Sequence, residues 1–85
     1  MEFSTYQREA STTAVYPGKG TWVGLMYVGL GLGEAGETQG KIKKVLRDDN
    51  FIVTDERREA ILGELGDILW YIAMVANELN ADLGE

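Results

Sequence analysis

Two pairs of carboxylates, each with its members three residues apart, are the positions in this chain best suited to chemistry. The first pair is Glu34 and Glu37, and the second is Glu64 and Asp67. Residues at this spacing lie on one face of a helix, and like charges placed there repel. The repetition suggests that a cation lies between the pairs, although spacing alone leaves a solvated helix surface equally open.

The residue types that are absent narrow the choice of metal. The sequence contains no cysteine and no histidine, so thiolate and imidazole ligands are both excluded. A metal would then be held by oxygen atoms, which favours Mg²⁺, Mn²⁺ or Ca²⁺ over Zn²⁺. A divalent-cation buffer or sensor is a weak alternative, because the sequence has no EF-hand loop pattern.

The overall charge and the hydrophobic pattern exclude other classes of protein. The net charge of −6 argues against binding to the outside of a nucleic-acid duplex, which needs clustered Lys and Arg. No apolar run approaches the roughly 20 residues that a membrane span needs, and the first residues do not read as a signal peptide. We therefore expect a soluble cytoplasmic protein that binds neither nucleic acid nor a membrane.

The chain has 85 residues, which predicts a single domain over 1–85. Its only proline, Pro17, separates a first helical segment, roughly 5–16, from the rest. A second segment runs roughly over 22–46 and a third roughly over 55–83. We expect an all-α subunit, a helical bundle of about three helices completed by oligomerisation, since a chain of this size buries a modest core.

Polar residues predict where these helices begin. Ser4 and Gln7 form a capping-box pattern, and Thr21 and Thr54 precede the second and third segments as caps. A break is expected around residues 47–50. The second segment contains six glycines, each costing about 1 kcal/mol in a helix relative to alanine. We still predict one helix there, because the apolar spacing continues across the glycines.

Helical geometry places each acidic pair beside the apolar face of its helix. Glu34 and Glu37 share a stripe with Lys41, and the second pair shares a stripe with Tyr71. If the helices pack antiparallel through their apolar faces, the acidic stripes meet along one edge, where divalent cations would offset the repulsion. Lys41 and Lys44 lie beyond the first pair, placed to meet phosphate oxygens or to pair with the acids.

A glycine-rich stretch at residues 31–36 fits the pattern G-x-G-x-x-G of dinucleotide-binding folds. That motif requires a preceding strand and a βαβ unit, with the pyrophosphate at a helix N-terminus. This chain offers no parallel sheet, and Glu34 within the stretch would repel the pyrophosphate. We therefore reject dinucleotide binding.

Taken together, the motifs resemble the MazG-like nucleotide pyrophosphohydrolases, which belong to the all-α NTP pyrophosphatases. The likeness includes residues 29–37 with the lysines that follow, residues 64–71, and positions between Tyr6 and Pro17. It extends over nearly the whole chain, and the two acidic motifs in this order are its most specific part. The resemblance implies a helical subunit that forms a homodimer or homotetramer, with the site built between helices.

The resemblance also implies an activity, the Mg²⁺-dependent cleavage of a nucleoside triphosphate to the monophosphate and pyrophosphate. Such a reaction serves either house-cleaning of the nucleotide pool or control of that pool. Matched residue by residue, Glu34, Glu37, Glu64 and Asp67 correspond to the ligands of Mg²⁺, for which Mn²⁺ could substitute. Glu37 and Glu34 are the candidates to orient or deprotonate the attacking water.

Other positions correspond to contacts with the substrate. Lys41 and Lys44 match positions near the phosphates, and Trp22, Tyr71 and Asn77 are candidates for contacts to the base or sugar. Trp22 stands at a helix start, where a packing role in the core is an equal alternative.

A second class of function stays open. A non-catalytic helical oligomer that keeps this fold would bind nucleotide or a protein partner in a regulatory role. Release of pyrophosphate from triphosphates in the presence of Mg²⁺, and its loss with EDTA, would distinguish the two.

Overall fold

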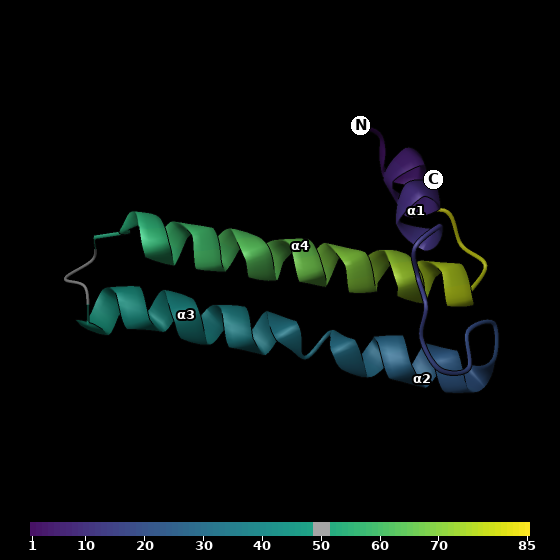
Figure 1. Cartoon of the computed structure of the whole chain (residues 1–85), viewed down its shortest axis with the longest axis horizontal. Coiled ribbons are helices and arrows are strands. Elements are labelled where there is room, and N and C mark those ends of the chain that lie inside the picture. The colour runs from purple at the N-terminus through teal and green to yellow at the C-terminus, as the bar shows by residue number, and fades with distance from the viewer. Residues whose placement is uncertain (49–51) are drawn as a thin grey trace. The chain divides into compact units, whose positions relative to one another are not determined.

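The computed structural model describes residues 1–48 and 52–85, and the regular elements in these ranges are all α-helices (Figure 1). They are α1 (Phe3–Ser11), α2 (Trp22–Gly31), α3 (Glu34–Asp48) and α4 (Asp55–Glu78). The prediction of an all-α protein is confirmed. None of these four helices is long and apolar enough to cross a membrane. The predicted break around 47–50 lies partly outside the described residues.

The chain forms two compact units, and α4 contributes to both. The first unit comprises Met1–Leu32 and Leu69–Glu85, so it holds α1, α2 and the C-terminal part of α4. The second unit comprises Gly33–Ile68, which holds α3 and the N-terminal part of α4. The expectation of a single domain stays a prediction.

The predicted helix over 22–46 is wrong in one respect, because two helices, α2 and α3, replace it. The chain leaves the helix at Leu32, whose N–H donates to the carbonyl of Gly29 at 3.2 Å in a tighter turn. Glycines at every second position from Gly29 to Gly33 make a continuous helix costly here. Apolar spacing across the glycines therefore did not suffice to keep one helix.

This break gives α3 an N-terminus of its own. Glu34 and Glu37 lie in the first turn of α3, where the helix dipole is positive. Carboxylates are stabilised at that position, so the dipole offsets part of their mutual repulsion. The helix dipole thus stabilises both acids at the start of α3, which it would not do in the middle of a helix.

The predicted caps of α2 and α4 are both confirmed. Thr21 Oγ1 accepts a hydrogen bond from the Val23 N–H at 3.2 Å, at the start of α2. Thr54 Oγ1 accepts one from the Arg57 N–H at 3.2 Å, at the start of α4. Each threonine satisfies a backbone donor that the first helical turn leaves without a partner.

The capping box predicted for the first helix is wrong. Glu2 is the N-cap of α1, and its side chain makes no capping hydrogen bond. The helix also ends at Ser11, earlier than the predicted segment 5–16. Thr12 and Thr13 donate hydroxyl hydrogen bonds to carbonyls three residues back, which favours leaving the α-helix at this point.

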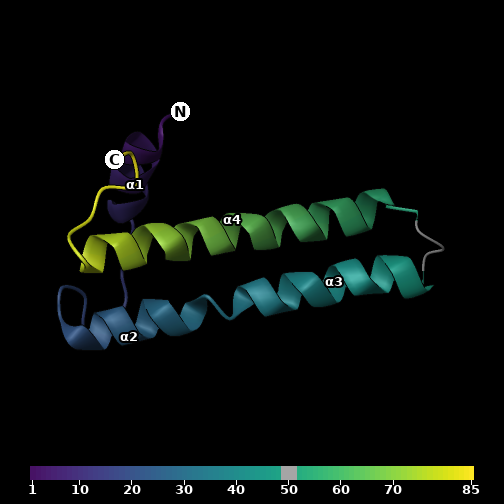
Figure 2. The ribbon, with the colours of Figure 1, turned by 180° about the vertical axis from the view of Figure 1, so that it is seen from behind.

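Gln7 instead ties α1 to the C-terminal residues, which run beside α1 in both views of the ribbon (Figures 1 and 2). Its buried amide nitrogen Nε2 donates to Asn77 Oδ1 at 2.6 Å and to the carbonyl of Ala81 at 2.7 Å. Its Oε1 accepts from the Leu83 N–H at 2.8 Å. The amide is fully used in joining distant parts of the chain.

The predicted end of the third helix near residue 83 is wrong, because α4 stops at Glu78. Asn80 adopts a left-handed backbone conformation with φ of 56°, and the Ala81 N–H donates to the carbonyl of Ala76 at 2.9 Å. Asparagine is one of the few residues besides glycine that commonly end a helix in this way.

The core of the first unit lies where α2 packs on α4. Val28 of α2 and both Ala73 and Met74 of α4 are fully buried, and Tyr16 from the connecting loop is largely buried beside them. Gly31, one turn after Val28, faces the ring of Tyr71 so closely that an added Cβ would overlap it. The absence of a side chain at this position allows the close approach.

The second unit buries less. Among its described residues, Thr38 and Val45 of α3 are buried. Large apolar side chains on both of its helices are exposed, namely those of Ile42, Leu46, Leu62 and Leu65. A pair of helices alone cannot enclose a core, so this unit leaves apolar surface for further packing.

Gly31→Ala should lower the free energy of unfolding by about 1–3 kcal/mol, because the new methyl group must displace the packed ring of Tyr71. Gly63→Ala is the matched control, since nothing lies within 4 Å of its added Cβ in the middle of α4. That control should be neutral or stabilising by up to about 1 kcal/mol. Urea unfolding followed by circular dichroism measures both, and equal stability of the two variants would contradict the packing argument.

Candidate metal centre

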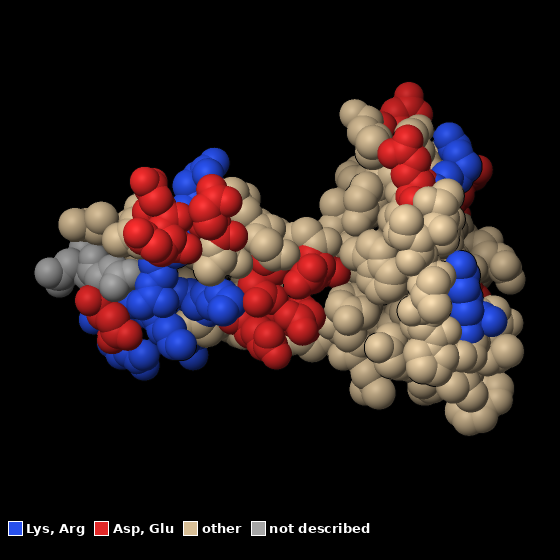
Figure 3. All heavy atoms as spheres, in the orientation of Figure 1, with Lys and Arg blue, Asp and Glu red and all other residues tan. Residues whose placement is uncertain are grey.

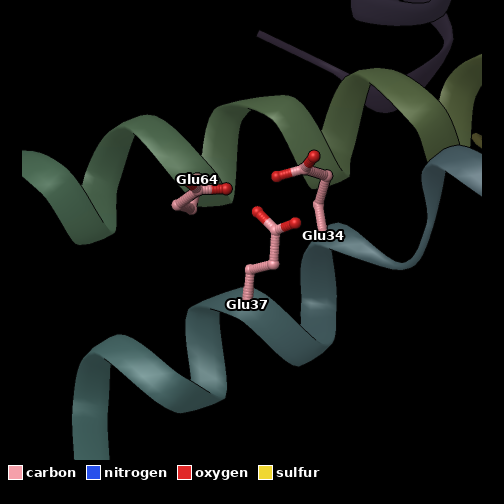
Figure 4. A group of neighbouring side chains, drawn as sticks. All are labelled: Glu34, Glu37 and Glu64. Atoms are coloured by element: carbon pink, nitrogen blue, oxygen red, sulfur yellow. The ribbon is translucent and has the colours of Figure 1, made fainter. Parts of the chain in front are cut away.

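Three of the four predicted acids come together in the second unit. Glu34 and Glu37 reach from the first turn of α3, and Glu64 faces them from α4 (Figure 4). Each offers a carboxylate oxygen, and these three oxygens all lie within 4.8 Å of one another. An oxygen cluster of this size suits a hard divalent cation, whose ligands are carboxylates and water.

The close approach of the three acids changes the pKa of Glu34. Its pKa is raised from 4.5 to about 7, first because protonated Glu34 can hydrogen-bond to Glu64. Desolvation and the negative charge of Glu37 raise it further. Without a cation, the cluster therefore takes up a proton near neutral pH rather than holding three full charges.

Glu64 is the least exposed of the three and has one oxygen unsatisfied. Its Oε2 is buried and accepts no hydrogen bond from the described residues, while Oε1 lies 3.8 Å from Nζ of Lys41. The side chain of Glu64 is 18% exposed, against 35% for Lys41. A buried acceptor without a partner is costly, and a cation or a proton on Glu34 would satisfy it.

The fourth predicted ligand, Asp67, does not belong to this cluster. It is exposed on α4, one turn beyond Glu64. The chain therefore gathers three acids where the spacing of the two pairs predicted four.

The two predicted lysines differ in their surroundings. Lys41 is half-buried and forms an ion pair with Glu64, which is one of the two roles predicted for it. Lys44 is exposed, and its positive charge acts on Asp48. The pKa of Asp48 is lowered first by Arg47 and also by the charge of Lys44. Lys41 is thus the cation placed directly at the acidic cluster.

Basic side chains continue from this point along the second unit. A group of Lys and Arg adjoins the acidic group on the face shown in Figure 3. The basic residues of this unit are Lys41, Lys43, Lys44, Arg47, Arg57 and Arg58. An acidic group that holds a cation, next to a basic group, is the charge pattern that suits a polyphosphate with its metal.

The predicted contacts to base or sugar lie in the first unit. Trp22 is 75% exposed at the start of α2, so it is not a core residue within this chain. Tyr71 packs beneath Gly31 and edge-on against Trp70, with ring centroids 5.3 Å apart. Asn77 accepts the hydrogen bond from Gln7. Tyr71 and Asn77 therefore have structural roles, and their roles toward a substrate stay predictions.

A polar pocket of about 190 Å³ in the first unit was not predicted. Polar residues recur along one face of α1 and could have indicated the pocket, but two of them, Ser4 and Gln7, were interpreted as a capping pattern. The pocket is lined by Ser4, Gln7, Arg8, Ser11, Asn77, Ala81 and Asp82.

Comparison with known proteins places the chain in a family. It is 49% identical over 84 aligned positions to the Gene 37 protein of Mycobacterium phage L5, covering 94% of this chain and 74% of that protein. The chain belongs to the family of this phage protein. No protein-family model matches the sequence, and no solved structure matches it. The name of this phage protein carries no activity, and the side chains of the acidic cluster are the features that indicate a chemistry.

The raised pKa of Glu34 predicts how stability depends on pH in this member of the phage family. The neutral form is favoured in the folded chain, so the stability due to this group is full below 4.5 and is lost as pH rises through about 7. Glu34→Gln should remove that loss, since its amide stays neutral. Thermal unfolding across this pH range measures the difference from wild type.

The matched control is Glu9→Gln, which removes an exposed carboxylate from α1 and should leave the pH profile of the wild type unchanged. Adding Mg²⁺ should raise the melting temperature of the wild type more at about pH 8 than at about pH 5, because metal and proton compete for the same oxygens. Parallel pH profiles for wild type and Glu34→Gln would contradict the assigned repulsion.

Proposed function

We propose that this chain is a Mg²⁺-dependent nucleoside triphosphate pyrophosphohydrolase, which converts a (d)NTP and water to the monophosphate and pyrophosphate in the cytoplasm. The observation that carries the proposal is the convergence of Glu34, Glu37 and Glu64, with an unsatisfied buried oxygen on Glu64. The resemblance of the two acidic motifs to MazG-like pyrophosphohydrolases supports the same reaction.

The donor set fits the proposed metal. Glu34, Glu37 and Glu64 would hold Mg²⁺, or Mn²⁺ in its place, because all three offer oxygen ligands and the sequence has no cysteine or histidine. Asp67, the fourth ligand that the resemblance implies, lies outside this set of three. When bound, Mg²⁺ supplies neutralisation of phosphate charge and a more acidic water.

The chain's own residues have separate roles in this proposal. Glu37 is the exposed member of the cluster, and its carboxylate would orient the attacking water and accept its proton. Glu34, whose pKa is raised to about 7 in the chain without a metal, would have to release its proton to serve as a ligand. Lys41 beside Glu64, and Lys44 beyond it, would hold phosphate oxygens and shield the charge of the leaving pyrophosphate.

One observation favours a second candidate function. Asp67 stands outside the acidic cluster, so the chain gathers three of the four acids that the resemblance implies. A regulatory oligomer that binds a metal–nucleotide complex without cleaving it would need only part of that set.

Purified protein incubated with mixed dNTPs and Mg²⁺ should release pyrophosphate, and EDTA should abolish the release. A panel of standard and modified triphosphates then ranks the substrates. Binding of a non-hydrolysable triphosphate without any turnover across the panel would favour the regulatory alternative.

Glu37→Gln should reduce turnover by about 100-fold or more, because loss of one metal ligand removes several kcal/mol of transition-state stabilisation. Glu56→Gln is the matched control, since Glu56 is exposed in the first turn of α4 and outside the cluster. The control should keep full activity, and both variants should keep wild-type helicity. Full activity of folded Glu37→Gln would refute the assignment of Glu37.

A further inference from the structure

The polar pocket of the first unit lies between α1 and the residues at and after the end of α4, which run side by side in Figures 1 and 2. Of the described residues that line it, only Ala81 is apolar. Its volume of about 190 Å³ is roughly six times the ~30 Å³ that one water takes in the liquid. Sites for drug-sized ligands begin at about 300 Å³. The pocket therefore suits a small polar molecule.

The backbone N–H of Leu83 fixes the direction of two amide side chains in this pocket. It donates to Oε1 of Gln7 at 2.8 Å, so the other end of that amide, Nε2, faces Asn77. Because Nε2 is a donor, Asn77 presents its oxygen, Oδ1, which accepts at 2.6 Å. Among the described residues, the amide nitrogen of Asn77 then meets only the sulfur of Met74, at 3.9 Å. Sulfur is a weak acceptor, so half-buried Asn77 keeps a donor for a ligand in the pocket.

The carboxylate of Asp82 supplies an open acceptor. Its Oδ1 accepts from the hydroxyl of Ser4 at 2.5 Å and from the N–H of Gly84 at 2.8 Å. These hydrogen bonds are the main cause that lowers the pKa of Asp82, so the group stays ionised. No described residue donates to the other oxygen, Oδ2, which leaves a charged acceptor at the pocket.

Arg8 supplies the opposite charge. Its positive charge also lowers the pKa of Asp82, so the two groups act on each other across the pocket. Arg8 nevertheless forms no ion pair with any described residue, and its hydrogen bond to Thr5 Oγ1 is long at 3.4 Å. Most of the five donors of the guanidinium group are therefore open to a ligand.

Two opposite charges that line one pocket without meeting select a ligand that carries both. A phosphate or a simple carboxylate would be repelled by Asp82, and a simple cation would be repelled by Arg8. An α-amino acid carries a carboxylate and an ammonium group. The carboxylate matches the donors of Arg8 and Asn77, and the ammonium group matches the open oxygen of Asp82.

The serine hydroxyls of the lining favour a polar side chain on this ligand. Ser4 donates its hydroxyl hydrogen to Asp82, and Ser11 donates its own to the carbonyl of Arg8 at 2.7 Å. Each serine oxygen therefore has lone pairs left to accept a hydrogen bond from the ligand. A large apolar side chain would leave these oxygens without a partner, at a cost in free energy.

We propose that this pocket binds a small, polar α-amino acid as its zwitterion, with the carboxylate on Arg8 and Asn77 and the ammonium group on Asp82. The proposal does not depend on the hydrolase activity. It assigns a role to Arg8, which the metal centre does not use.

Isothermal titration calorimetry of the full chain with L-serine tests the proposal. Serine should bind with a dissociation constant of about 1 mM or below. Serinamide lacks the carboxylate and N-acetylserine lacks the ammonium group, so each should bind at least about tenfold more weakly through loss of a charge-assisted hydrogen bond. Leucine should also bind more weakly than serine, and inorganic phosphate should not bind.

Two variants test the groups that hold the carboxylate. Arg8→Gln should weaken serine binding at least about tenfold. Arg58→Gln is the matched control, since Arg58 is exposed in the second unit and paired with Glu59, and it should bind serine like wild type. Asn77→Asp keeps the oxygen that accepts from Gln7 and puts a negative charge in place of the donor, so it should abolish binding. Circular dichroism confirms that each variant is folded.

A third variant tests the group that holds the ammonium. Asp82→Asn should bind serine and N-acetylserine with equal affinity, because the charge that distinguishes them has been removed. No saturation at about 10 mM serine would overturn the proposal. Serine binding in Arg8→Gln that equals wild type, leucine or serinamide binding as tightly as serine, or binding of inorganic phosphate would do the same.

Discussion

The meeting of Glu34, Glu37 and Glu64 in a small volume is the constraint on which the second unit depends. Their oxygens lie within 4.8 Å of one another, a distance at which like charges in a partly desolvated place repel strongly. The chain offsets this repulsion by three means. Lys41 pairs with Glu64, the N-terminus of α3 faces two of the acids, and Glu34 takes a proton near neutral pH. A divalent cation would do the same with one ion.

The break before α3 links this electrostatic arrangement to the backbone. In a continuous helix over 22–46, Glu34 and Glu37 would lie at mid-helix, where the dipole gives no benefit. The interruption at Leu32 and Gly33 places both acids at a helix N-terminus instead. The glycines that made the sequence look like a dinucleotide motif therefore allow a new helix to start where the two acids lie.

The sequence predicted best what depends on local chemistry. The all-α class and the caps at Thr21 and Thr54 follow from residue spacing and short-range hydrogen bonds. The approach of Glu64 to the first acidic pair follows from packing two helices through their apolar faces, which the hydrophobic spacing indicated. The predicted helix boundaries near Leu32 and Glu78 were less accurate, because glycine and asparagine permit several conformations and the spacing does not choose among them.

The hydrogen bonds between the two ends of the chain could not be predicted. Ser4 and Gln7 have the types and spacing of a capping box, yet their partners are Asp82 and Leu83 at the other end of the chain. A polar side chain can hydrogen-bond within its own helix or to a distant segment, and the neighbouring sequence does not show which partner it takes. Asp67 shows the converse, since its spacing from Glu64 is suitable and its carboxylate still lies outside the cluster.

The two compact units each leave one physical requirement unmet within a single chain. The second unit holds carboxylates that a cation would neutralise, and the first holds an apolar helix, α2, whose large side chains are exposed on one side. An 85-residue chain buries a smaller fraction of its surface than a larger domain does, so its stability is sensitive to unneutralised charge and to exposed apolar surface. A cation held by these acids would bind the folded chain and not the unfolded one, so it would add to the stability of the fold by mass action. Binding of such a cation would therefore be coupled to folding through the acids that the fold alone satisfies least.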